Sequence, residues 1–154
     1  MSPLSPSLPP LADHVELLRD SLLRLTGRDL LDYPGASTDP EAAAFEAPFA
    51  LLSHDTQDDP IFTYGNRTAL QLFELDWTAF TALPSRLSAE PLARDERQRL
   101  LDRVTRYGYI DDYSGVRVSA TGRRFTITGA TVWNLTSSDG AYAGQAAMFS
   151  KWTS

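Results

Sequence analysis

Residues 131–152, TVWNLTSSDGAYAGQAAMFSKW, carry the strongest structural pattern in the chain. Two runs typical of β-strands flank Asp139-Gly140, and an Asp-Gly pair in that position is a strong signal for a tight hairpin. If these two residues form the loop, Ser138 faces Ala141. The register that follows places Asn134 directly opposite Gln145, on the same face of the sheet.

This pair of carboxamides is the most site-like feature of the sequence, because the rest of the hairpin is mostly apolar. Two interpretations are open. Asn134 and Gln145 could form a cross-strand hydrogen bond that fixes the register. They could instead present donors and acceptors to the edge of a flat heteroaromatic or amide ligand.

Composition limits the classes of function. The chain has 154 residues, which suits one domain with one sizeable core. Its net charge of −6 provides no basic field for nucleic acid or an anionic membrane. No apolar run is long enough to span a bilayer, and residues 1–10 lack a secretory signal. We therefore expect a soluble, cytoplasmic protein with no nucleic-acid or membrane partner.

Residues 1–10 contain four prolines and three serines, a composition typical of a disordered lead-in. Residues 11–38 predict a helix and a linker, and residues 39–154 form the main domain. The helix carries an apolar stripe from Leu11 to Leu25 at helical spacing. Such a stripe must cover something, either the chain's own sheet or a partner subunit in a homodimer.

The main domain predicts an α+β order of elements. In sequence, these are a short helix from Pro40 to Phe45, strands at residues 48–53 and 60–64, a helix after Asn66, short turns over residues 77–91, a long helix from Arg94 to Tyr107, and three strands from Tyr109 onward with a bulge at Ser114-Gly115.

The last strands are apolar on both faces. Phe125, Ile127, Trp133 and Leu135 share one face if no bulge intervenes, and the other face holds Val132, Ala147 and Phe149. A sheet with one solvated face alternates cleanly between apolar and polar residues. We therefore expect the middle helices on one face and the first helix on the other.

Signals for catalysis and metal binding are weak. Ser53, His54 and Asp55 are consecutive strand residues that point to alternating faces, so they cannot form a triad. The acidic residues at 55–59 fit a polar turn better than a cation site. With no cysteine, disulfides, thiolate nucleophiles and iron–sulfur clusters are excluded. No catalytic residue and no metal ligand is predicted.

Several long motifs resemble the MEKHLA domain family, in its stand-alone bacterial form. They are SHDTQDDPIFTYGNRTALQLFELDWTAFTALPSRLSAEP (Ser53 to Pro91), GYIDDYSGVR (Gly108 to Arg117), GRRF, VWNL and GQAAMFSKW. The resemblance extends from about Pro40 to Trp152. It implies a PAS-like fold, a five-stranded antiparallel sheet with helices on one face and an N-terminal helix, and a sensory role with no named ligand.

Light-sensing PAS domains that bind flavin carry similar segments on their last two strands. Trp133-Asn134-Leu135 and Gly144-Gln145 look similar to them. This chain departs from that group because it has no cysteine for a photochemical adduct and a shorter hairpin. The resemblance therefore leaves flavin as one option, and the cofactor stays unknown.

Three functional hypotheses follow. The leading one is a non-catalytic sensory or ligand-binding module that signals through helix packing or dimerisation. In it, Asn134 and Gln145 orient the ligand, and four aromatic side chains wall the pocket: Trp133, Trp77, Phe80 and Phe73. The second is a protein–protein interaction module whose own aromatic side chains fill the pocket. The third is a small-molecule enzyme with His54 or Asp112 as a base.

Overall fold

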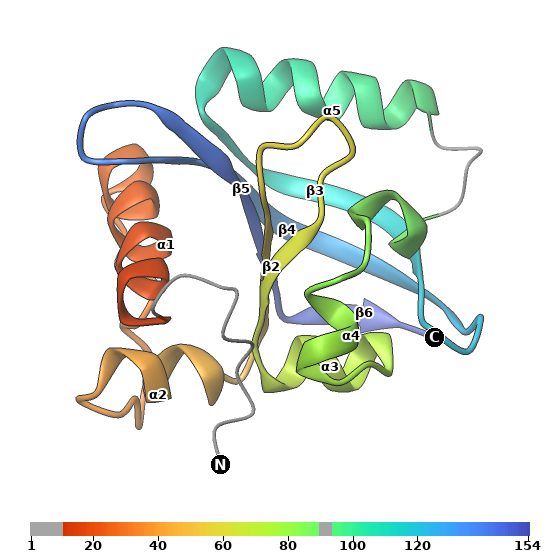
Figure 1. Cartoon of the computed structure of the whole chain (residues 1–154), viewed down its shortest axis with the longest axis horizontal. Helices are drawn as coiled ribbons and strands as arrows, with labels where there is room; N and C mark the ends of the chain where they lie inside the picture. The colour runs from red at the N-terminus through yellow and green to blue at the C-terminus, as the bar shows by residue number, and fades with distance from the viewer. Residues whose placement is uncertain (1–10, 90–93) are drawn as a thin grey trace.

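One antiparallel sheet forms the centre of the molecule (Figure 1). The computed structural model describes residues 11–89 and 94–154, so the predicted disorder of residues 1–10 lies outside the described residues. The elements are α1 (Leu11–Thr26), α2 (Pro40–Phe45), β1 (Ala50–His54), β2 (Phe62–Gly65), α3 (Arg67–Phe73), α4 (Trp77–Phe80), the 3-10 helix η1 (Ser85–Ser88), α5 (Arg94–Tyr107), β3 (Tyr109–Val118), β4 (Arg124–Thr136), β5 (Tyr142–Phe149) and β6 (Lys151–Thr153).

The main strand order is β2-β1-β5-β4-β3, with every neighbouring pair antiparallel, so the predicted five-stranded fold is confirmed. A short strand that the sequence analysis did not anticipate, β6, also pairs with β4. It follows a break at Ser150 and continues along β4, so Trp152 lies opposite Ile127. Among the described helices, none is long and apolar enough to cross a membrane.

The hairpin between β4 and β5 has the predicted pairing but a different loop. The amide of Ser137 donates to the carbonyl oxygen of Ala141 at 2.9 Å, so the loop has one more residue than the expected Asp139-Gly140 pair. A register shift then follows Leu135, and Gly144 adopts a φ of 125°. This second irregularity cancels the first and restores Asn134 opposite Gln145.

Gly144 cannot carry a side chain at this point. Its φ lies in the region that favours glycine, and an added Cβ would collide with the carbonyl oxygen of His54 in β1. The bulge thus brings β5 close to β1 where the two strands begin to pair, because His54 is the partner of Gln145.

A further bulge in β4 changes which residues share a face. Gly115 pairs with Ile127 and Tyr113 with Ala130, so the additional residue is in β4, where Gly129 has a φ of 65°. Phe125 and Ile127 therefore lie with Ala130 in one cluster, whereas Trp133 and Leu135 belong to another. These four large side chains were expected to share a face only in a strand without a bulge, and the bulge at Gly129 means that they do not.

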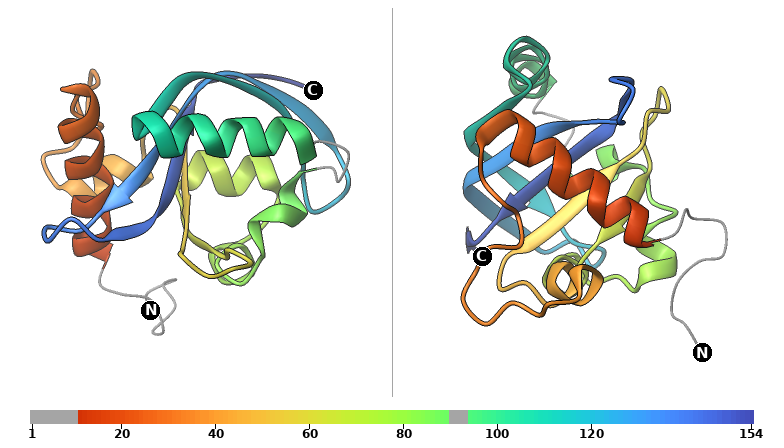
Figure 2. Two further views of the ribbon diagram at one scale, coloured as in Figure 1. Left: turned by 90° about the horizontal axis from the view of Figure 1, so that it is seen from above. Right: turned by 90° about the vertical axis from the view of Figure 1, so that its left-hand side faces the viewer.

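The helix α1 covers one face of the sheet, away from α5 (Figure 2). Val15, Leu18 and Leu22 are fully buried there, and the indole nitrogen of Trp133 donates to the carbonyl oxygen of Leu18 at 3.2 Å. Arg24 donates to the carbonyl oxygen of Thr136 at 2.6 Å. Of the two alternatives for the apolar stripe, the structure shows the first: the stripe packs on the chain's own sheet.

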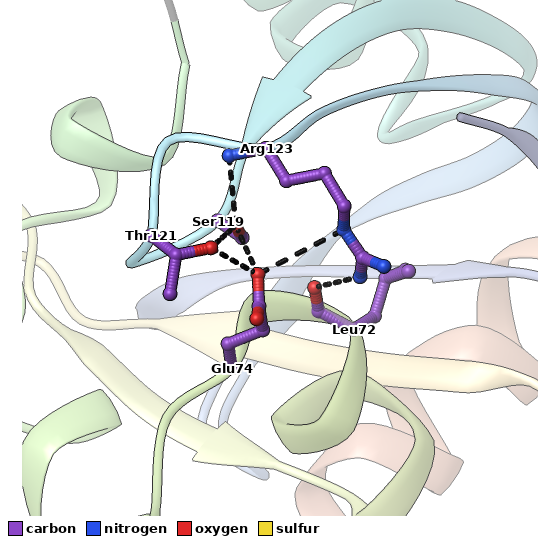
Figure 3. Close-up of polar contacts among 5 residues, drawn as sticks. All are labelled: Leu72, Glu74, Ser119, Thr121 and Arg123. Atoms are coloured by element: carbon purple, nitrogen blue, oxygen red, sulfur yellow. Dashed lines mark hydrogen bonds and ion pairs between the residues drawn. The ribbon is translucent and has the colours of Figure 1, made fainter.

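The turn between β3 and β4 is tied to the end of α3 (Figure 3). Glu74 has a left-handed backbone with a φ of 60°, and its Oε1 accepts hydrogen bonds from Ser119 at 2.5 Å and Thr121 at 2.6 Å. Arg123 donates to the carbonyl oxygen of Leu72 at 3.4 Å. The Ser119 and Thr121 hydroxyls, followed by the Arg123 charge, lower the pKa of the Glu74 carboxyl.

We expect Glu74→Ala to destabilise the fold more than Glu74→Gly does. Both variants lose the two hydroxyl partners, but glycine adopts the left-handed backbone without strain whereas alanine keeps the strain. Urea denaturation of the wild type and the two variants measures their free energies of unfolding and so gives the order of stability. An alanine variant as stable as the glycine variant would mean that backbone strain at this position is negligible.

His14 is the buried titratable group of α1. Its ring stacks on Tyr64 at 5.8 Å between centroids, and its Nε2 lies 2.9 Å from the Ser53 hydroxyl oxygen. Burial lowers the pKa of His14 from 6.5 to about 4. The neutral ring is therefore the form that the folded protein holds.

The free energy of unfolding should fall as the pH drops from 6.5 towards 4. Over that interval His14 becomes protonated in the unfolded chain but stays mostly neutral in the folded protein. The resulting loss in the free energy of unfolding is on the order of 3 kcal/mol. Urea denaturation at several pH values measures it. His14→Gln should flatten this part of the profile. An unchanged slope in His14→Gln would contradict the assignment.

Candidate functional site

A cavity of about 530 Å³ lies on the face of the sheet opposite α1. Its volume is within the range of pockets that bind small molecules. The wall is built from most of the elements of this side: strands β1 to β5, the end of α3, the helix η1, and Leu100 of α5. Residues far apart in sequence therefore meet at one site.

The middle of the cavity is apolar. Its largest side chains are Phe62, Phe73, Phe149 and Ile127, all of which belong to one buried cluster. Phe80 belongs to the same cluster and stacks on Phe62 with 4.2 Å between ring centroids. It is fully buried behind that ring and supports the wall from outside the cavity.

At one end the Asn134–Gln145 pair meets α5. The Nε2 of Gln145 donates to the Oδ1 of Asn134 at 3.3 Å, and the Nδ2 of Asn134 donates to the carbonyl oxygen of Val104 at 3.4 Å. Gln145 lines the cavity and is 8% exposed. Within the described residues, its Oε1 has no hydrogen-bond partner. The cross-strand bond thus exists, and it leaves one acceptor of Gln145 open.

His54 also belongs to this end of the cavity, because β1 places it opposite Gln145. Its Nδ1 lies 2.9 Å from the carbonyl oxygen of Asp55. Asp55 itself closes the following turn by accepting from the amide of Ile61 at 3.1 Å. Among the described residues, no group of three His, Asp or Glu side chains could hold a metal ion.

Two arginines that the sequence analysis did not select also line the cavity. Arg117 of β3 lines the cavity and donates to the phenolic oxygen of Tyr113 at 3.2 Å. Arg86 of η1 also lines it, and its Nε contacts both oxygens of Asp59, at 3.0 and 3.2 Å. In sequence, both arginines look like ordinary surface residues, because no local pattern shows that η1 and β3 meet.

The structure brings together only part of the predicted site. Gln145 and Phe73 line the cavity, Asn134 holds Gln145, and Phe80 supports Phe62. The other two, Trp133 and Trp77, lie in the cluster packed under α1 and do not line the cavity.

The misplacement of Trp133 has a simple cause. It is the neighbour of Asn134 in β4, and successive strand residues point to opposite faces, so the two cannot share a pocket. Trp77 packs its ring edge against Tyr64 at 5.6 Å between centroids, on the same side as His14. The four aromatic walls predicted from sequence are thus divided between the two faces.

Comparisons with known proteins place the fold among PAS domains. The PAS domain of a protein from Colwellia psychrerythraea is 13% identical, with a TM-score of 0.60, and the match covers 69% of this chain and 87% of that one. The photo-excited fungal photoreceptor Vivid is 14% identical, with a TM-score of 0.58 and coverage of 87% and 94%.

The dark structure of the LOV domain of Aureochrome1, another blue-light photoreceptor, is 18% identical, with a TM-score of 0.52 and coverage of 66% and 74%. At such low identities these likenesses show the fold alone. None of the curated proteins compared with the chain matches it. The sequence model of the MEKHLA domain matches residues 12–154, which include α1 as well as the region from Pro40 onward. The chain therefore belongs to the MEKHLA domain family.

Proposed function

We propose that this protein is a sensory module that binds a small molecule in the cavity and signals through the packing of α1. The observation that carries the proposal is the cavity itself: about 530 Å³, apolar along its middle, with the open carboxamide acceptor of Gln145 at one end. Apolar pockets with a few convergent polar groups are typical of ligand sites.

The ligand that fits this end has a flat edge with a hydrogen-bond donor. Gln145 Oε1 would accept from that edge, while the bond to Asn134 holds the carboxamide in place. A flavin is one molecule of this description, and one of the similar solved structures concerns a flavin analogue and the mechanism of a light-oxygen-voltage domain. Since the chain has no cysteine, any flavin here would bind without a cysteinyl adduct.

The two faces of the sheet offer a direct route from cavity to helix. In β1, Leu52 and His54 line the cavity, while the hydroxyl of Ser53 between them lies 2.9 Å from His14 of α1. In β4, Val132 lines the cavity and its neighbour Trp133 donates to Leu18 of α1. A ligand that shifts either strand would therefore change the contacts of α1, provided that it binds the two arrangements with different affinity.

This route differs from dimerisation through the apolar stripe of α1. Because Val15, Leu18 and Leu22 are buried in the chain's own core, a partner could reach them only after α1 undocks. We propose that the packing of α1 on its own sheet is the element that responds.

The two alternative hypotheses have less support. A module with a filled core needs aromatic side chains where the cavity lies, and two of the predicted aromatic residues pack under α1 instead. An enzyme needs a base in the cavity. Asp112 is exposed and pairs with Arg103 at 2.8 Å, and the described lining holds no aspartate or glutamate beside His54. We propose a non-catalytic role.

Filling the cavity should abolish ligand retention. We expect the freshly purified protein to carry a small molecule, visible as a native mass above that of the bare chain or as absorption beyond the protein band. Ala147→Phe places a ring among the lining residues and should remove both signals. The matched variant Ala141→Phe, at an exposed residue beside the hairpin loop, should keep them.

A wild-type protein with the mass of the bare chain, which also gains no thermal stability from any compound of a metabolite library, would overturn the proposal. Retention of the same compound by a folded Ala147→Phe variant would place the ligand elsewhere. Circular dichroism establishes that each variant is folded.

Substitutions of Gln145 and Asn134 should have different effects, the first on ligand binding and the second on stability. Gln145→Leu keeps the volume but removes the acceptor, so ligand occupancy should fall at least about 10-fold. Asn134→Ala removes two hydrogen bonds without touching the cavity wall, so its main effect should be a loss of about 2 kcal/mol of stability. Native mass spectrometry and urea denaturation give the two readouts. Equal stability loss in both variants, with occupancy unchanged, would make the pair purely structural.

A further inference from the structure

The cavity has two chemically different ends that lie far apart on the sheet. Gln145 pairs with Asn134 near the end of β4, whereas Arg117 pairs with Phe125 near its beginning. At the usual rise per strand residue, and allowing for the bulge at Gly129, these positions are roughly 25 Å apart along β4. A molecule that uses the cavity fully is therefore elongated.

Charge is distributed unevenly over the described lining. It includes two arginines, Arg86 and Arg117, and no aspartate or glutamate, although the whole chain has a net charge of −6. Arg86 is already neutralised by Asp59, which accepts from its Nε with both carboxylate oxygens. The acidic surface thus supplies a partner to one arginine of the cavity and not to the other.

Arg117 has no acidic partner among the residues that the structure describes. Its Nη2 donates to the neutral phenol of Tyr113 at 3.2 Å, and its guanidinium lies over that ring at 5.6 Å from the centroid. Tyr113 thus holds the partly buried guanidinium in position without cancelling its charge. A planar fork of donors held in this way suits a carboxylate, which accepts two parallel hydrogen bonds.

Next to this cation the cavity is apolar. Ile127, Phe73 and Phe149 line it within one buried cluster, so the part of a ligand that follows its anionic group meets hydrocarbon and aromatic surface. A carboxylate carries the single negative charge that Arg117 can balance, whereas a phosphate group carries nearly two and Asp59 already occupies Arg86.

We propose that the ligand of this cavity is an elongated amphipathic carboxylic acid, bound by its carboxylate on Arg117 and by its apolar body along the aromatic middle. This inference rests on the proposed function, since it names the class of molecule that the same cavity takes. Gln145 receives a polar group at the far end where the ligand has one.

Decanoate is the probe, because it joins one carboxylate to an apolar chain. Isothermal titration calorimetry measures its binding to protein freed of small molecules, at pH 7.5, where the acid is ionised. Decanamide has the same length without the charge. Arg117→Gln removes the guanidinium, and Arg28→Gln, at an exposed residue after α1, is the matched variant with the same loss of charge.

Decanoate should bind the wild type and Arg28→Gln with equal affinity, and at least about 10-fold more weakly to Arg117→Gln. Decanamide should bind the wild type about as weakly as decanoate binds Arg117→Gln. Equal affinity of decanoate for both arginine variants, equal affinity of the acid and the amide, or no binding of decanoate would each overturn the assignment.

These outcomes are distinct from a failure of the proposed function. If Ala147→Phe abolishes binding of decanoate while Arg117→Gln does not, the cavity binds ligands but Arg117 does not select acids. If wild type retains an uncharged compound that Ala147→Phe loses, and decanoate does not bind, the sensory proposal stands and the carboxylate assignment is wrong.

Discussion

Trp133, near the end of β4, determines which face of the sheet is closed and which holds the cavity. It is completely buried, and its indole nitrogen donates to the backbone of α1. Burying so large a ring contributes several times the thermal energy, and α1 is the element that covers it. Once Trp133 faces α1, its strand neighbours Val132 and Asn134 must face α5. The position of the carboxamide pair follows from this packing.

The cavity depends on irregular backbone as well as on packing. The bulge at Gly129 turns Phe125 and Ile127 to the cavity face, and the one at Gly144 lets β5 approach β1 so that His54 lies opposite Gln145. Glu74 supplies a third irregular point, at which a left-handed residue joins α3 to the β3–β4 turn. Such features increase twist and redirect side chains, and they are common beside functional sites.

Two clusters, one on each side of the sheet, share the same strands. His14 and Leu18 of α1 contact strand residues whose immediate neighbours line the cavity. In the role proposed above, this arrangement would couple the occupancy of one face to the packing of the other without a separate relay. The helix α1 precedes the region that the quoted motifs cover, but it lies within the MEKHLA domain, whose model matches residues 12–154.

The sequence by itself determined the fold class, the order of elements, the two-sided sheet and the pairing of Asn134 with Gln145, because periodicity, turn residues and long family motifs are local signals. The pairing was correct although the loop was not, since the longer loop and the bulge at Gly144 cancel. Only the tertiary structure decided which aromatic side chains line the cavity and that Arg117 and His54 belong to it. One reason is that a bulge moves the side chains that follow it to the opposite face of the sheet. The other is that the cavity joins segments distant in sequence. Neither feature produces a periodic pattern in the sequence.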